Sequence, residues 1–207
     1  TATGNAVERP EIGYFVTTVG EKPAVESEVV DSVAQAFLGT RVGCARCHNH
    51  PLERYTQDDF YRFAAFFSHL TVERKELEKG ATELVPIGRE ERDRRRELEE
   101  AGKKLKEAET KLLQAGTNEL AAARGQFTDR QREYAERKRN AESAARKPPA
   151  AWQPRTRRDV EASPLDRSRL PWQPGDDPRA ALAAWITSPT NDAFSGAMVN
   201  QIGRAHV

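Results

Sequence analysis

The segment between residues 89 and 147 restricts the fold of this chain more than any other part of its sequence. It is rich in Arg, Glu, Lys and Ala, and its apolar positions recur at heptad spacing. These positions are Leu98, Ala101, Leu105, Ala108, Leu112 and Ala115 in the first half, and Leu120, Phe127, Tyr134 and Ala141 in the second. The pattern breaks at residues 115–118, which predicts two helices folded back as an antiparallel hairpin. Because much of the seam is alanine, and Gly102 and Gly125 lie inside the helices, we expect a weak, partly frayed hairpin.

Composition limits how much of the chain can pack around a core. Apolar residues make up 37% of the 207 residues and charged residues 31%, below and above the usual globular shares respectively. We therefore expect a mostly α-helical chain, made of a small helical domain, the charged hairpin and irregular linkers. The net charge of +1 gives no general attraction to nucleic acid or anionic membranes, and no apolar run approaches the roughly 20 residues that span a bilayer.

Two further helices are predicted on either side of the two cysteines. Residues 25–38 carry an apolar stripe at helical spacing, formed by Val29, Val30, Val33, Ala34 and Phe37. A second helix should begin near Thr56, because Thr56 and Asp59 have the spacing of a capping box. Its aromatic face is formed by Phe60, Phe63 and Phe67.

The remaining segments have weaker patterns. Residues 1–24 look irregular, with a short β-prone run at residues 14–18. Residues 148–177 are proline-rich and favour an extended linker. A last helix should begin at Pro178, a good first-turn residue, with Asp177 as its cap.

The strongest chemical signal is the motif Cys44, Ala45, Arg46, Cys47, His48. Covalent haem attachment needs two thiols for the two vinyl groups of one porphyrin and an imidazole that reaches the iron from the same loop, and this spacing supplies all three. His48 would be the iron ligand. The sequence contains no arrangement of residues that we would interpret as catalytic, so we do not expect this chain to be an enzyme by itself.

Other chemistry remains open for the same residues. Cys44 and Cys47 could form a redox or local structural disulfide, although no thioredoxin-like pattern surrounds them. The two cysteines could also hold zinc together with His48 and His50. His50 could equally support the haem site, or cap a turn.

Four stretches together resemble a known family: Val33–Gly39, Cys44–Pro51, Tyr55–Tyr61 and Phe63–Phe67. This is the planctomycete cytochrome-c-like domain of unknown function, family number fifteen forty-nine. Tyr55 stands where the family usually has Trp, and Phe60 where it usually has Tyr. The resemblance implies a large exported protein of several domains, and the unsettled activity of the family supplies no reaction.

A second resemblance lies near the end of the chain. Residues 177–185, 188–191 and 197–200 resemble the start of the domain that usually follows this family in the same polypeptide. Residues 201–207 resemble the translation of a sequencing-library adaptor, which predicts a truncated reading frame. The expected organisation is therefore a cytochrome-c-like domain at 1–88, the hairpin at 89–147, a linker at 148–177, the start of a second domain at 178–200 and an artefactual tail at 201–207.

These observations lead to one functional expectation and one alternative. The first is a c-type haem-binding module for electron transfer, periplasmic or secreted, with a redox protein and the following domain of the same polypeptide as partners. The alternative is a non-redox structural or interaction module that contains a Cys/His zinc site or a local disulfide.

Overall fold

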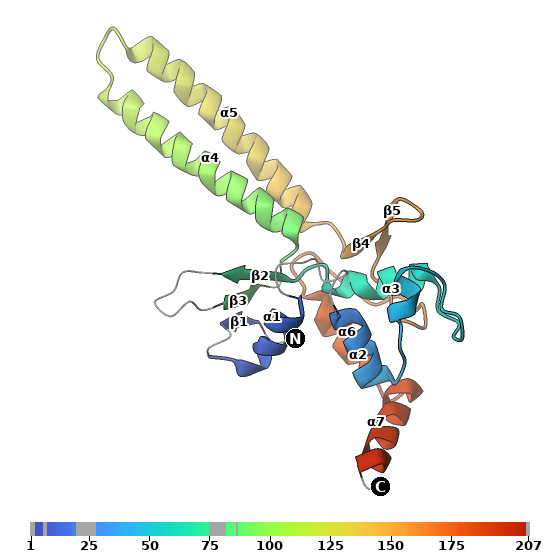
Figure 1. The fold of residues 1–207 in the computed structure, drawn as a ribbon. Helices are drawn as coiled ribbons and strands as arrows, with labels where there is room; N and C mark the ends of the chain where they lie inside the picture. The colour runs from blue at the N-terminus through green and yellow to red at the C-terminus, as the bar shows by residue number, and fades with distance from the viewer. Residues whose placement is uncertain (1–2, 6–7, 20–27, 75–81, 86, 206–207) are drawn as a thin grey trace. The chain divides into compact units, whose positions relative to one another are not determined.

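The computed structural model describes residues 3–5, 8–19, 28–74, 82–85 and 87–205. Most of these residues are helical, which confirms the predicted mostly α fold (Figure 1). The chain divides into two compact units. Unit 1 is formed by residues 1–88 and 148–207, and unit 2 by residues 89–147. None of the helices in the described part is long and apolar enough to cross a membrane.

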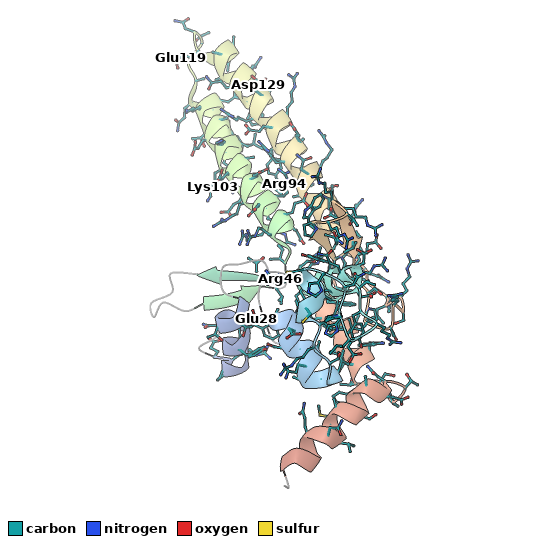
Figure 2. The ribbon with its side chains drawn as sticks, turned by 45° about the vertical axis from the view of Figure 1, so that its right-hand side comes forward. Glu28, Arg46, Arg94, Lys103, Glu119 and Asp129 are labelled. Atoms are coloured by element: carbon teal, nitrogen blue, oxygen red, sulfur yellow. The ribbon has the colours of Figure 1, made fainter. Side chains whose placement is uncertain are left out.

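Unit 2 is the predicted antiparallel hairpin, formed by α4 (Arg89–Gln114) and α5 (Leu120–Ala145). Its fully buried side chains are small, namely Ala101, Ala108, Ala141 and Ala144. Charged side chains such as Arg94, Lys103 and Asp129 extend from both helices (Figure 2). Both helices continue without a break through Gly102 and Gly125, so the structure shows no fraying there, and the weakness of the hairpin stays a prediction.

Ion pairs between the two helices supplement this thin seam. Glu97 on α4 binds both Arg94, one turn earlier, and Arg137 on α5, with N–O distances of 3.0 and 2.9 Å. Lys147 lies 2.7 Å from Glu90. All of these side chains are more than a third exposed, so each pair contributes little to stability.

The beginning of unit 1 differs from the prediction. After β1 (Gly4–Asn5), a 3-10 turn at Pro10–Ile12 leads into α1 (Gly13–Val19), so the β-prone run at 14–18 is helical. Thr17 and Thr18 each donate a side-chain hydrogen bond to the carbonyl of Tyr14, at 3.1 and 2.6 Å. These bonds and the packing of Phe15 against the core outweigh a weak local preference.

The centre of unit 1 is formed by the two helices on either side of the cysteines. Helix α2 (Val29–Leu38) buries Val29, Val30, Val33, Ala34 and Leu38, whereas Phe37, predicted in this stripe, is 43% exposed. Gly39 ends α2 with φ +65°, a conformation that favours glycine. Helix α3 (Gln57–Ala64) begins with the predicted capping box, and a 3-10 turn at Ala65–Phe67 extends its aromatic face. Phe60, Phe63, Phe66 and Phe67 are all buried.

Two small antiparallel sheets complete unit 1. In the first, β3 (Thr82–Val85) lies between β1 and β2 (Thr71–Arg74). The second pairs β4 (Ala150–Gln153) with β5 (Arg158–Glu161), aligning Ala150 with Glu161 and Gln153 with Arg158.

The second sheet lies where an extended linker was expected at 148–177. The linker interpretation is wrong for this stretch, because Ala151, Val160 and Leu165 are buried in the same core as α2 and α3. The sequence of β4 shows no alternation of apolar and polar residues, because the polar Gln153 is buried and the apolar Trp152 is exposed.

Helix α6 (Pro178–Ile186) begins at Pro178 with Asp177 as its cap, as predicted, and α7 (Asp192–Ala205) follows. Leu182 and Ile186 of α6 also belong to the main core. Residues 178–200 therefore pack with 1–88 in one unit, although the sequence resemblance assigned them to the start of another domain.

Candidate functional site

The cysteine motif lies on a 3-10 turn, Gly43–Arg46, between α2 and α3. Ala45 is completely buried, whereas Cys44 and Cys47 are exposed and both are free thiols. The backbone N–H of Cys47 donates to the carbonyl of Cys44 at 3.4 Å. The turn thus anchors the loop in the core through Ala45, and it leaves Cys44 and Cys47 exposed to solvent.

Asp31 holds the N-terminal side of this loop. Its Oδ1 accepts hydrogen bonds of 2.7 Å from the backbone N–H groups of both Val42 and Gly43. A Cβ at position 43 would lie 3.1 Å from Cγ of Asp31, so glycine leaves room for this close approach. Asp31 cannot be recognised from the sequence, because an acidic residue in the first turn of a helix is already favoured by the helix dipole.

The first turn of α3 holds the C-terminal side of the loop. The buried Gln57 donates from Nε2 to the carbonyl of Arg46 at 2.9 Å, and its backbone N–H donates to Oδ1 of Asn49 at 3.1 Å. The Tyr61 hydroxyl donates to the same carbonyl at 3.4 Å. The carbonyl between the two cysteines is therefore fixed by two side chains of one helix, a role for Gln57 that its sequence position did not reveal.

A hydrogen bond fixes the tautomer of His48 in its neutral form. Its Nδ1 lies 2.7 Å from the carbonyl oxygen of Asn49. A carbonyl can only accept, so Nδ1 carries the proton, and in the neutral ring the lone pair is on Nε2. Metal-binding histidines commonly donate from the non-ligating nitrogen in this way. His48 is exposed, so Nε2 can be approached from solvent.

His50 adopts the opposite tautomer. Its Nδ1 accepts hydrogen bonds from the backbone N–H groups of Leu52 and Glu53, at 3.2 and 3.0 Å, so the neutral ring carries its proton on Nε2. Its own backbone N–H donates to the carbonyl of Tyr55 at 2.8 Å. A metal on Nε2 would place a proton on Nδ1 and break both bonds. Across the described ranges, no three His, Cys, Asp or Glu side chains are grouped to hold a metal ion.

Asp59 joins the helix behind the loop to a distant segment. Its carboxylate accepts from the backbone and hydroxyl of Thr56, both at 2.8 Å, and from Arg167 in a bidentate pair at 2.8 Å. Burial alone would raise the pKa of Asp59, but the hydrogen bonds from Arg167 and Thr56 outweigh it and lower the pKa. Arg167 has φ +63°, an unusual conformation for arginine that is fixed at this ion pair.

The residues present fit a covalently attached haem in the chemistry of their donor atoms. Two exposed thiols and an imidazole with its lone pair on Nε2 lie within five consecutive residues. Exposed apolar side chains lie on the segments before and after them: Phe37 is 43% exposed and Leu52 is 89% exposed. Such side chains can contact a flat apolar group.

Comparison with known proteins gives one match. The model of a family described as PSCyt2, protein of unknown function (DUF1549), matches residues 17–72. This span contains the motif, α2 and α3, and it supports the family resemblance predicted from residues 33–67. No curated protein and no solved structure matches the chain.

Proposed function

We propose that this chain binds a c-type haem, held by thioether bonds to Cys44 and Cys47, and serves as an electron-transfer module. His48 would bind the iron through Nε2. The observation that carries the proposal is the hydrogen bond from His48 Nδ1 to Asn49, which leaves the lone pair on Nε2 of an exposed histidine that directly follows two exposed cysteines in the sequence. The cytochrome-like name of the matched family, PSCyt2, is consistent with it.

A haem at this site would supply one-electron redox chemistry. The protein's own contribution is to position the donor atoms. Asp31 and Gln57 hold the two sides of the turn, and Asn49 keeps the proton of His48 on Nδ1. Because a ligand imidazole with a fixed ring and a hydrogen-bonded Nδ1–H is a better electron donor to iron, Asn49 would also tune the site.

The proposal includes a cellular setting. Thioether attachment of haem takes place outside the cytoplasm, so we place the parent protein in the periplasm or outside the cell. Its partners would be a redox protein and the domain that follows in the same polypeptide.

The test is expression of the full chain in a periplasm that contains cytochrome maturation machinery, followed by haem staining of a denaturing gel. The Cys44→Ala/Cys47→Ala variant is the negative control, and His50→Asn is the matched control because His50 serves the turn. Staining of wild type and His50→Asn, with none in the double variant, supports covalent haem. A folded wild-type protein without staining contradicts it.

One observation favours a second candidate, a non-redox structural or interaction module. Asp31, Asn49, Gln57 and His50 hold the loop through protein hydrogen bonds. A zinc site in this module would need His50 to release two backbone N–H groups. A folded, stain-negative protein whose thiols remain titratable and whose thermal midpoint is unchanged by zinc or a chelator would support this module without a metal.

A further inference from the structure

The segments around the cysteines contain an excess of arginine. Residues 39–58 and 152–159 together hold six arginines, no lysine and three carboxylates, so they carry a charge of +3 in a chain whose total is +1. Five of the six arginines are exposed, namely Arg41, Arg54, Arg155, Arg157 and Arg158. Residues 89–147 carry a charge of +4, so the rest of unit 1 carries −6, and within unit 1 the excess of positive charge lies in these two segments.

Side-chain contacts join these two segments in space. Nε2 of the buried Gln153, on β4, donates to Asp58 Oδ1 at 3.0 Å and to Gln57 Oε1 at 3.5 Å. Gln57 in turn donates to the carbonyl of Arg46, between the two cysteines. Two side chains thus separate the β4–β5 hairpin from the motif, and the hairpin lies beside α3 (Figure 1).

The turn of this hairpin, residues 154–157, contains an arginine in a backbone conformation that is unfavourable for its side chain. Arg157 has φ +52°, where glycine or asparagine is favoured. Within the described part of the chain, the side chains of Arg155 and Arg157 form no ion pair or hydrogen bond, so their charges do not serve the fold. Trp152, on β4 two residues before the turn, is 55% exposed. An unpaired basic turn with an exposed tryptophan has the composition of a binding surface.

We propose that Arg41, Arg46, Arg54, Trp152, Arg155 and Arg157 form a docking surface, the arginine face, for the acidic surface of a redox-partner protein. The inference rests on the proposed function, because electron exchange requires the partner to approach the cysteine motif. Electron-transfer contacts are small and are guided by complementary charge, with a few apolar side chains at the centre. The arginines would attract the partner, and Trp152 would supply the apolar contact.

The test uses the two thiols as local probes in the reduced full chain, which needs no haem. The reagents are the dianionic 5,5′-dithiobis(2-nitrobenzoate) and the neutral 4,4′-dithiodipyridine. In each reaction a thiolate attacks the reagent disulfide, one mixed disulfide forms and one arylthiolate leaves. Cys44 and Cys47 are the only cysteines of the chain. The rate constant with the anionic reagent, divided by that with the neutral reagent, therefore reports the electrostatic potential at the motif.

We expect the anionic reagent to be favoured at low ionic strength and the preference to disappear as salt is added. Arg155→Gln/Arg157→Asn should lower the ratio at least about threefold at low salt, because two nearby charges are removed. Asparagine tolerates the conformation at position 157, so this variant should remain folded. The matched control, Arg96→Gln/Arg139→Gln in unit 2, makes the same change in net charge and should leave the ratio unchanged.

A second experiment tests whether this surface binds an acidic protein. Polyglutamate, as a model of an acidic protein surface, should protect the thiols of the wild type from the neutral reagent and should not protect those of Arg155→Gln/Arg157→Asn. Protection by heparin without protection by polyglutamate would contradict an acidic protein partner. Equal reagent ratios in wild type and variant would overturn the arginine face altogether.

The failure of the haem proposal and the failure of the arginine face give different results. A chain that does not stain for haem but shows the reagent preference has a basic surface at the motif, and it loses both the proposed cofactor and the redox partner. A chain that stains for haem and shows no preference loses the arginine face. In the haem-loaded protein, oxidation by ferricyanide should slow with added salt, and oxidation by the cationic tris(phenanthroline)cobalt(III) should accelerate.

Discussion

The two units of this protein are stabilised in different ways. Unit 1 buries large side chains from distant segments, such as Phe63, Val30 and Ile186, and it uses buried polar groups such as Gln57 and Asp59 to hold one loop. Unit 2 buries alanines along a single seam and leaves its charged residues in solvent. Unit 1 therefore fixes the loop of the cysteine motif through contacts between segments that are distant in the sequence, whereas unit 2 depends mainly on local helix formation.

The largest expected difference concerns the core. Phe63→Ala removes a fully buried ring and should lower the free energy of unfolding of unit 1 by about 3–5 kcal/mol. Leu113→Ala, at an 81% exposed position of unit 2, should change stability by less than about 0.5 kcal/mol. Urea unfolding followed by circular dichroism measures both. Equal losses would contradict the division between a packed and a thinly packed unit.

The next effect concerns the carboxylate behind the motif. Asp59→Asn should destabilise unit 1 by about 2 kcal/mol, because the bidentate bond to Arg167 and part of the capping box are lost. The folded-state pKa of Asp59 is lowered, so its contribution is fully present above the unfolded pKa of about 3.9 and is lost as pH falls through the folded pKa.

Unfolding free energies of wild type and Asp59→Asn measured between pH 7 and pH 2 check this sign. The two proteins should converge as the pH falls, and a difference that stays constant would show that the carboxylate charge is not responsible. Arg132→Gln serves as the control, because Arg132 lies 3.8 Å from Asp129 in an exposed pair of unit 2 and should have no measurable effect.

The smallest effects come from one substitution made in each unit, with opposite signs. Gly39→Ala should destabilise unit 1 by about 1 kcal/mol, because φ is +65° and the new Cβ would meet Cβ of Ala197 at 3.3 Å. Gly125→Ala should stabilise unit 2 by about 0.5–1 kcal/mol, because the position is helical and nothing lies within 4 Å. Thermal unfolding of the two variants measures both, and the same sign in both would contradict the local description of unit 2.

The sequence predicted best where the pattern is local. The heptad spacing of Leu98 to Ala115 located unit 2, and Thr56 with Asp59 located the start of α3, because both signals depend on neighbours within two turns. The β4–β5 hairpin at 150–161 was missed because it buries a polar residue, Gln153, whose hydrogen bonds to Gln57, Asp58 and Thr156 are not recorded in any short sequence pattern. The run at 14–18 became a helix because packing of Phe15 outweighed its preference.

For the proposed haem site, the sequence indicates the donor residues, whereas the residues that support the loop appear only in the structure. Cys44, Cys47 and His48 are recognisable from spacing alone, since the chemistry of haem attachment requires them in one short loop. The roles of Asp31 and Gln57 depend on backbone groups 11 residues away in sequence, which appear only when the chain is folded. The tautomer of His50 likewise depends on the turn that follows it.

Covalent attachment of haem is tested by the visible absorption spectrum of the full chain matured in a haem-loading periplasm, recorded after denaturation and acid–acetone extraction. We expect a haem band that stays with wild-type protein and with the Arg155→Gln/Arg157→Asn variant, and that is absent from Cys44→Ala/Cys47→Ala. A band that is extracted completely from folded wild-type protein, or that is equal in the cysteine variant, would contradict covalent attachment at Cys44 and Cys47.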